Sequence, residues 1–213
     1  MNKTGTAREN LRADAARNVG LLLAAAGKLL RTDPEHAAMA DIAAEAKLSL
    51  ATAYRYFPTL EKLHSEYIHS VVWNLRGYSI SSPLYGKAMF LDVVRKWIGI
   101  LEIYGKAMTQ IRSRRGFLDR LDSKDEVITL MEGVFDRPIR EALGELGISE
   151  KHFRYALFLF NIIFDAREVG DLRNHGFTET DVASMLGQAY FGAVQGFVHA
   201  RETEASTPSS VSQ

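Results

Sequence analysis

The sequence has no cysteine, only five prolines and no net charge. The lack of cysteine and of net charge limits the kinds of function that the protein can have. Without cysteine the chain cannot form a disulfide, a thiolate zinc site or a cysteine nucleophile. This composition fits a reducing compartment, and we expect a cytoplasmic protein. Because 26 basic residues balance 26 acidic ones, any binding of nucleic acid must rest on local placement of charge.

Targeting signals and long apolar runs are also missing. Residues 1–17 are polar and charged, and the apolar run at 21–30 is short and follows several charges, so we expect no signal peptide. The longest apolar stretch, around residues 155–164, is far shorter than the roughly 20 residues that span a membrane. We therefore expect no membrane partner.

Motifs of common enzymes are absent as well. None of the six histidines lies four residues from another, and the sequence has neither a phosphate-binding glycine loop nor a nucleophile elbow. Glu66 and His69 are three residues apart on a predicted helix, but two ligands make a poor metal site, and we interpret them as surface residues. We expect no enzymatic activity, no cofactor and no metal.

The apolar residues that are present recur at helical spacing throughout, and no alternating strand pattern appears. The 213 residues suffice for one large domain or for a small head and a larger body. We expect an all-α fold with a small N-terminal helical head at 8–76. A larger helical body should follow at 77–203, and a disordered tail rich in Ser and Thr at 204–213.

Residues 39–63 form the most specific pattern in the chain. They predict two short helices joined by a tight turn, and then a third helix. Ser49 can cap the second helix with its hydroxyl, and Pro58 ends that helix because proline disfavours helical geometry at the residue before it. The outward side of the second helix remains exposed, as in helices that enter a DNA major groove.

This stretch resembles the TetR family of transcriptional regulators. The shared pattern is an Ile-Ala helix, a recognition helix that starts at Ser49, the sequence Thr-x-Tyr-x-Tyr-Phe-Pro and a capped fourth helix, over about residues 15–68. The alternative interpretation is an unrelated helical hairpin with ordinary core spacing. The resemblance implies an all-helical homodimer. Its head, at 8–76, would be a three-helix, helix-turn-helix DNA-binding domain, and its body, at 77–203, a helical ligand-binding and dimerisation domain that binds a small molecule.

The resemblance also implies which residues meet the DNA. Leu50 and Ala51 can contact thymine methyl groups but cannot hydrogen-bond to guanine. Three residues depart from the family: Lys47 replaces a usual glycine, Ala53 a common leucine, and Leu60 a frequent phosphate-binding lysine. The predicted DNA-binding residues are Lys47, Ser49, Leu50, Ala51, Thr52, Tyr54, Arg55, Tyr56 and Thr59.

Small residues recur in the last predicted helix, at about 178–201. Glycine weakens an isolated helix by roughly 1 kcal/mol, but it allows another helix to come close. Together with the apolar helix at 153–164, this predicts a four-helix interface between two subunits, with packing inside one subunit as the alternative. The small residues are Ala183, Gly187, Gly192, Ala193 and Gly196.

A ligand pocket is predicted between the body helices from aromatic and methionine side chains, although such a stripe often forms ordinary core. The effector would be largely apolar. The candidate ligand-binding residues are Trp97, Tyr104, Met108, Met131, Phe135 and Phe158.

Head and body together predict a ligand-responsive transcriptional regulator, which we expect to be a repressor that binds a near-palindromic operator as a dimer. Two alternatives stay open. One is a helical small-molecule-binding protein with a degenerate DNA-binding head. The other is a regulator of the same fold that senses no small molecule.

Overall fold

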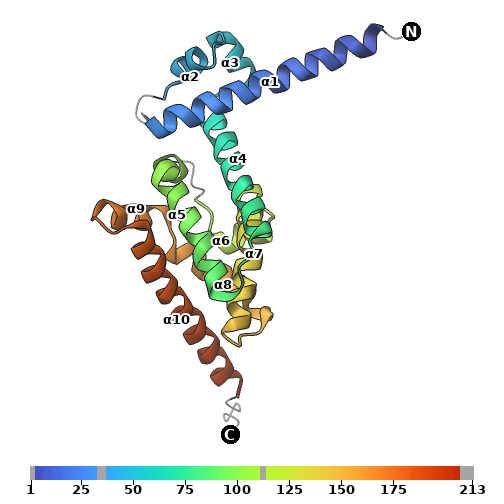
Figure 1. The fold of residues 1–213 in the computed structure, drawn as a ribbon. Coiled ribbons are helices and arrows are strands. Elements are labelled where there is room, and N and C mark those ends of the chain that lie inside the picture. Colours follow the sequence, from blue (N-terminus) through green and yellow to red (C-terminus); the bar gives the residue numbers. More distant parts are fainter. Residues whose placement is uncertain (1–2, 33–36, 111–113, 207–213) are drawn as a thin grey trace. The chain divides into compact units, whose positions relative to one another are not determined.

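The structure is a computed structural model that describes residues 3–32, 37–110 and 114–206, and every regular element in these ranges is a helix (Figure 1). The predicted all-α fold is therefore confirmed. The chain divides into two compact units, Met1–Ser70, here called the head, and Val71–Gln213, the body. The sequence-based boundary between 76 and 77 lies inside a helix and remains a prediction.

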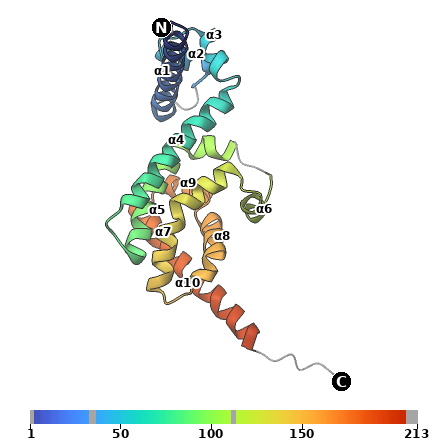
Figure 2. The same cartoon turned by 90° about the vertical axis from the view of Figure 1, so that its right-hand side faces the viewer.

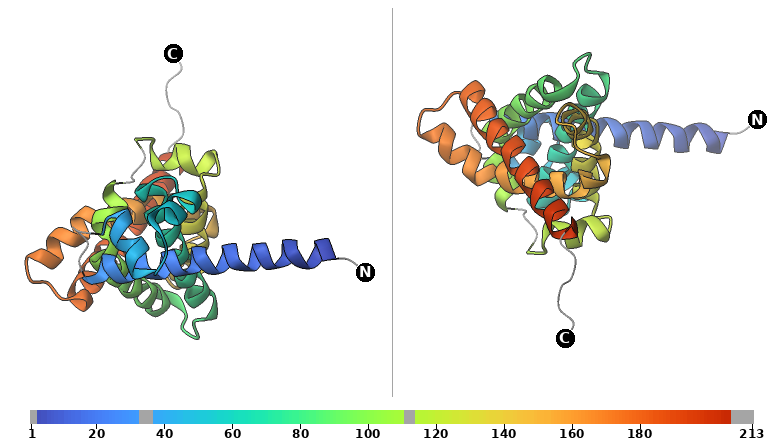
Figure 3. Two further views of the ribbon diagram at one scale, coloured as in Figure 1. Left: turned by 90° about the horizontal axis from the view of Figure 1, so that it is seen from above. Right: turned by 90° about the horizontal axis from the view of Figure 1, so that it is seen from below.

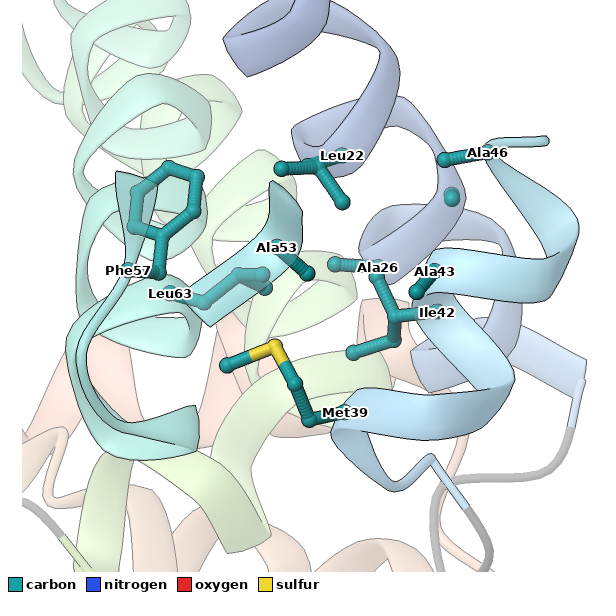
Figure 4. Packing of buried hydrophobic residues seen from close by; sticks show 10 residues of the cluster. Leu22, Ala26, Met39, Ile42, Ala43, Ala46, Ala53, Phe57 and Leu63 are labelled. Atoms are coloured by element: carbon teal, nitrogen blue, oxygen red, sulfur yellow. The ribbon is translucent and has the colours of Figure 1, made fainter. Parts of the chain in front are cut away.

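The head contains α1 (Lys3–Thr32), α2 (Met39–Glu45), α3 (Leu50–Tyr56) and the start of α4 (Leu60–Ser81). Its core is built largely from small side chains, which let the helices approach each other closely (Figure 4). Five of its ten residues are alanines. The ten are Leu22, Ala25, Ala26, Met39, Ile42, Ala43, Ala46, Ala53, Phe57 and Leu63.

Helix α1 is longer than the head core requires. Its 30 residues span about 45 Å at 1.5 Å per residue. Val19 of α1 packs against the head core, and the helix continues well past it toward the N-terminus (Figure 3).

The body follows from the last turns of α4 and is organised around α5, which packs against α7, α9 and α10 (Figure 2). Residues 111–113, between α5 and α6, lie outside the described residues. The body elements are α5 (Gly86–Gln110), α6 (Phe117–Asp122), α7 (Glu126–Glu145), the short 3-10 helix η1 (Glu150–His152), α8 (Phe153–Ile163), α9 (Ala166–Asn174) and α10 (Glu179–Ser206).

Aromatic rings fill the body core around the fully buried Phe90. Its ring stacks on that of Tyr190, with the centroids 4.7 Å apart. The buried Tyr190 hydroxyl donates a hydrogen bond to the carbonyl of Ala156, 3.1 Å away, and burial raises its pKa above the ordinary value. The other rings in contact with Phe90 are Phe160, Phe164 and Phe191.

Several helix ends differ from the sequence-based expectation. The predicted boundary after residue 76 does not end a helix, because α4 continues through Gly77 to Ser81. The apolar helix predicted at 153–164 corresponds to α8, which η1 precedes and α9 follows, and the Asp165 carboxylate accepts from the amide of Arg167 where α9 begins. Residues 204–206 of the predicted tail continue α10, and 207–213 lie outside the described residues.

Side chains of α7 hold the connection between α4 and α5. The Arg137 guanidinium donates to three carbonyls of this connection, those of Ile80, Ser82 and Leu84, at 2.9, 3.0 and 3.3 Å. From the same helix, the carboxylates of Glu141 and Glu145 accept from the first amides of α5, at Gly86 and Lys87. These bonds satisfy backbone groups that a helix end leaves without partners.

Candidate nucleic-acid interface

The turn between α2 and α3 contains a lysine in a conformation that favours glycine. Lys47 has a φ of 57°, in the left-handed region. Its amide donates to the carbonyl of Ala44, and the amide of Leu48 donates to that of Ala43, at 3.0 and 2.9 Å. These bonds satisfy backbone groups at the end of α2, as in turns where glycine occupies this position. The turn therefore accepts a lysine, whose exposed side chain carries its cation away from the core.

Ser49 caps α3 as predicted. Its Oγ accepts a hydrogen bond from the amide of Thr52 at 3.1 Å, and the two hydroxyl oxygens lie 2.8 Å apart. One hydroxyl proton lies between the two oxygens, which leaves the other proton free to point elsewhere. The start of α3 therefore presents a hydroxyl donor beside its first amides, a combination suited to a phosphate oxygen.

The outward face of α3 combines apolar and polar groups. Leu50 and Tyr54 are 44% and 47% exposed, and Ala51 and Arg55 are also exposed. Ala53 points into the core beneath them. Four of the side chains predicted to face outward are thus exposed, whereas Thr52 and Tyr56 are half-buried.

Tyr56, at the end of α3, is linked both to α1 and to its own neighbour. Its hydroxyl accepts from Asn18 Nδ2 at 3.4 Å and from Arg55 Nη2 at 3.2 Å. These two bonds hold the pKa of Tyr56 below its ordinary value, with the Asn18 bond contributing most. Because both lone pairs accept, the hydroxyl proton of Tyr56 is directed outward. Sequence reasoning missed Asn18, which lies 38 residues away along the chain.

Thr59 caps α4, since its Oγ1 accepts from the amide of Lys62 at 3.1 Å. The Glu61 carboxylate accepts from its own amide and from the Thr59 hydroxyl, and these bonds lower its pKa. A negative charge therefore already lies at this helix start. Leu60, which stands where the family often has lysine, packs partly buried against the head core instead.

The predicted ligand-binding residues lie in the body, where some of them meet. The rings of Trp97 and Phe135 are both buried and meet edge to face at 6.2 Å. Tyr104 is buried, whereas Met108 and Met131 are half-buried. Phe158 is also half-buried, and its ring lies against Phe117 of α6. The Trp97 indole N–H is buried without a hydrogen-bond acceptor among the described residues.

A groove of about 750 Å³ lies elsewhere in the body, beside α7 and the start of α5. Its walls are mainly charged, in contrast to the predicted apolar pocket. The lining residues are Tyr85, Gly86, Asp136, Arg137, Arg140, Glu141, Gly144, Glu145 and Glu150.

Comparison with known proteins gives a similarity of structure but none of sequence. No protein-family model matches the chain, and no curated protein matches it significantly. A crystal structure of a candidate TetR-family transcriptional regulator from Mesorhizobium loti is similar over 86% of this chain and 97% of its own. The two share 15% sequence identity, and the TM-score is 0.49.

Within the described residues, no helix combines the length and the apolar character that crossing a membrane requires. In the same part of the chain, no three His, Asp or Glu side chains are grouped so that they could hold a metal ion.

Proposed function

We propose that the protein is a cytoplasmic, homodimeric transcriptional repressor that binds a near-palindromic operator through α3 and responds to a small molecule bound in the body. The observation that carries the proposal is the capped helix-turn-helix, whose second helix exposes Leu50, Ala51, Tyr54 and Arg55 to solvent. The TetR-family resemblance of about residues 15–68 supports the same function.

Each exposed side chain of α3 has a chemically suitable part of DNA to contact. Leu50 and Ala51 fit thymine methyl groups in the major groove, and the Tyr54 hydroxyl can exchange hydrogen bonds with base edges. Arg55, the outward hydroxyl proton of Tyr56 and the exposed ammonium of Lys47 suit phosphates, which position the head without reading sequence.

Dimerisation is supported by an uncovered face of α8 and α10. On α10, Gly192 and Gly196 are exposed, and a Cβ built on either would meet nothing within 4 Å. Gly187 differs, because its Cβ would collide with Leu91 of the same chain. Met185 and Ile162, which are 41% and 51% exposed, add apolar surface. A second copy packed here would bury that surface and give the two-fold symmetry of a palindrome.

A response to a small molecule is supported by the buried indole N–H of Trp97 beside Phe135. An unpaired buried donor costs free energy, which an acceptor on a ligand would recover. A largely apolar effector with a carbonyl or ether oxygen therefore suits the space beside the Trp97 indole and the Phe135 ring. By thermodynamic linkage, an effector that weakens operator binding must itself bind more weakly to the DNA complex.

The DNA-binding part is tested by selecting duplexes from a random pool with purified protein and measuring their affinity by fluorescence anisotropy. Tyr54→Ala should weaken binding of the selected duplex by roughly tenfold, within the 1–3 kcal/mol typical of a base contact. Tyr85→Ala, at a tyrosine that is 68% exposed in the body, is the matched control and should bind as the wild type does.

If a folded dimer selects no duplex, the proposal fails, and a helical small-molecule binder with a degenerate head becomes the better account. If operator binding is strong but Trp97→Phe leaves every induction response in cells unchanged, the regulator that senses no small molecule is favoured.

The dimer is tested by sedimentation. Gly192→Leu should shift the protein to monomer, because overpacking a close helix crossing costs roughly 1–3 kcal/mol. The control is Gly144→Leu, at an exposed helical glycine of α7 that also has open space around it. A wild-type monomer at micromolar concentration, or equal dimerisation of both variants, would contradict the proposed interface.

A further inference from the structure

The start of α1 precedes the part of this helix that packs in the hydrophobic core of the head. Residues 3–18, here called the projecting segment, precede Val19, the first α1 residue that packs against the head core. At 1.5 Å per residue the segment is about 24 Å long. Figures 1 and 3 show it extending away from α2 and α3.

The projecting segment is positively charged in a chain that has no net charge. Four basic residues, Lys3, Arg8, Arg12 and Arg17, outnumber two acidic ones, Glu9 and Asp14. The first turn carries no acidic residue, so the positive end of the helix dipole adds to this charge. A helix of this length is only marginally stable in water by itself, and a polyanion alongside this basic segment would stabilise it.

The projecting segment is continuous with the candidate nucleic-acid interface. It ends at Asn18, whose amide nitrogen donates to the Tyr56 hydroxyl at the end of α3. The charge of Asp14 also acts on the pKa of Tyr56, which places that carboxylate near the same hydroxyl. The side chains of Arg12 and Arg17 are exposed on this segment.

We propose that the projecting segment lies along the DNA that flanks each operator half-site, with Arg12 and Arg17 on phosphates. We infer DNA as the partner because the segment is positively charged and is continuous with the exposed face of α3. The inference rests on the proposed DNA-binding function. A segment of about 24 Å covers roughly 7 base pairs, since base pairs rise 3.4 Å each. The contacts concern the backbone, so they add affinity without adding sequence specificity.

The experiment compares two duplexes that contain the same selected operator, one ending at its edges and one with 10 extra base pairs on each side. The wild type should bind the longer duplex at least roughly tenfold more tightly, and Arg12→Gln/Arg17→Gln should lose most of that advantage. The log–log dependence of affinity on salt should also become less steep in the variant, by about 0.9 for each phosphate contact removed. Glutamine is chosen because its helix propensity is close to that of arginine.

A control variant removes the same charge elsewhere. Lys96→Gln/Lys151→Gln takes two exposed cations from the body and should keep both the flank advantage and the salt dependence. Equal affinity of the wild type for the short and the long duplex would overturn the inference while leaving the proposed function intact. Loss of binding to every duplex by a folded wild-type dimer would instead remove the proposed function. Binding of phosphatidylglycerol vesicles through Arg12 and Arg17, with no flank effect on DNA, would also overturn the inference.

Discussion

The head and the body are both helical, yet their cores are built from opposite kinds of side chain. Half of the head core is alanine, and its one aromatic ring is Phe57. The body core is instead a cluster of rings in contact with Phe90. A small-residue core leaves no room for added atoms, whereas a ring core depends on the large area that each ring buries. The head should therefore be most sensitive to added volume, and the body to lost volume.

The largest effect should come from removing the central ring of the body. Phe90→Ala should lower the free energy of unfolding of the body by about 3–5 kcal/mol, because the cavity loses contacts with four rings. Urea denaturation followed by tryptophan fluorescence measures this selectively, since Trp73 and Trp97 both lie in the body. A loss below 1 kcal/mol would show that the neighbouring rings move to fill the cavity. The predicted difference in sensitivity between the head core and the body core would then be wrong.

The matching test in the head adds volume. Ala53→Leu should cost about 1–3 kcal/mol, because Ala53 is fully buried among the side chains of the head core. Ala51→Leu, two residues away on the exposed side of α3, is the control and should change stability little. Circular dichroism during thermal unfolding compares them. Stabilisation by Ala53→Leu would indicate that the head core has spare room.

The same contrast explains what the sequence could predict. The local rules held in the head: Ser49 caps α3, α3 ends before Pro58, and Thr59 caps α4. Each of these depends on residues within about four positions, so each can be read from the order of residues. The outward face of α3 followed from the same local spacing.

Features that depend on distant residues were not predictable. The Asn18–Tyr56 bond joins positions 38 apart, and Arg137 reaches carbonyls more than 50 residues away. Gly187 and Gly192 look alike in the sequence, but only packing reveals that Leu91 covers one and leaves the other open.

A third, smaller effect compares the helix caps of the two regions. Asp125 caps α7 by accepting from the amides of Val127 and Ile128, and the hydrogen bond from Arg120 is the largest cause that lowers its pKa. A folded-state pKa below the unfolded one means that the carboxylate stabilises the fold above the unfolded pKa. This stabilisation is lost as the pH falls through the folded pKa.

Asp125→Asn keeps a capping oxygen but loses the charge that accepts from Arg120, so it should cost about 1–2 kcal/mol at pH 7 and little at a pH below the folded pKa. Ser49→Ala in the head removes an uncharged cap, so its cost of about 1 kcal/mol should not vary with pH. Urea denaturation of both variants and the wild type, from pH 7 down to the lowest pH at which the wild type still folds, measures the difference. A constant deficit for Asp125→Asn would mean that the charge of this cap is unimportant.

The smallest effect should be a gain in stability, and it should be equal in the two regions. Lys47 in the head and Lys124 in the body have φ values of 57° and 54°. Replacing either with glycine relieves left-handed strain and should stabilise its unit by about 0.5 kcal/mol, after the larger chain entropy of glycine is subtracted. Lys62→Gly, inside α4, should instead destabilise by roughly 1 kcal/mol. The thermal unfolding midpoints of the three variants show whether each substitution stabilises or destabilises the protein.

The bonds that α7 makes to the connection between α4 and α5 have a consequence for proteolysis. Leu84 and Tyr85 are exposed beside Pro83 and would attract chymotrypsin if the connection were an ordinary loop. A protease must draw its substrate into an extended form, which here requires breaking the Arg137 bonds to three carbonyls and the Glu141 and Glu145 bonds to the start of α5. Cleavage after Tyr85 should therefore be slow in the native protein, despite the exposure of that side chain, and should accelerate in Arg137→Gln.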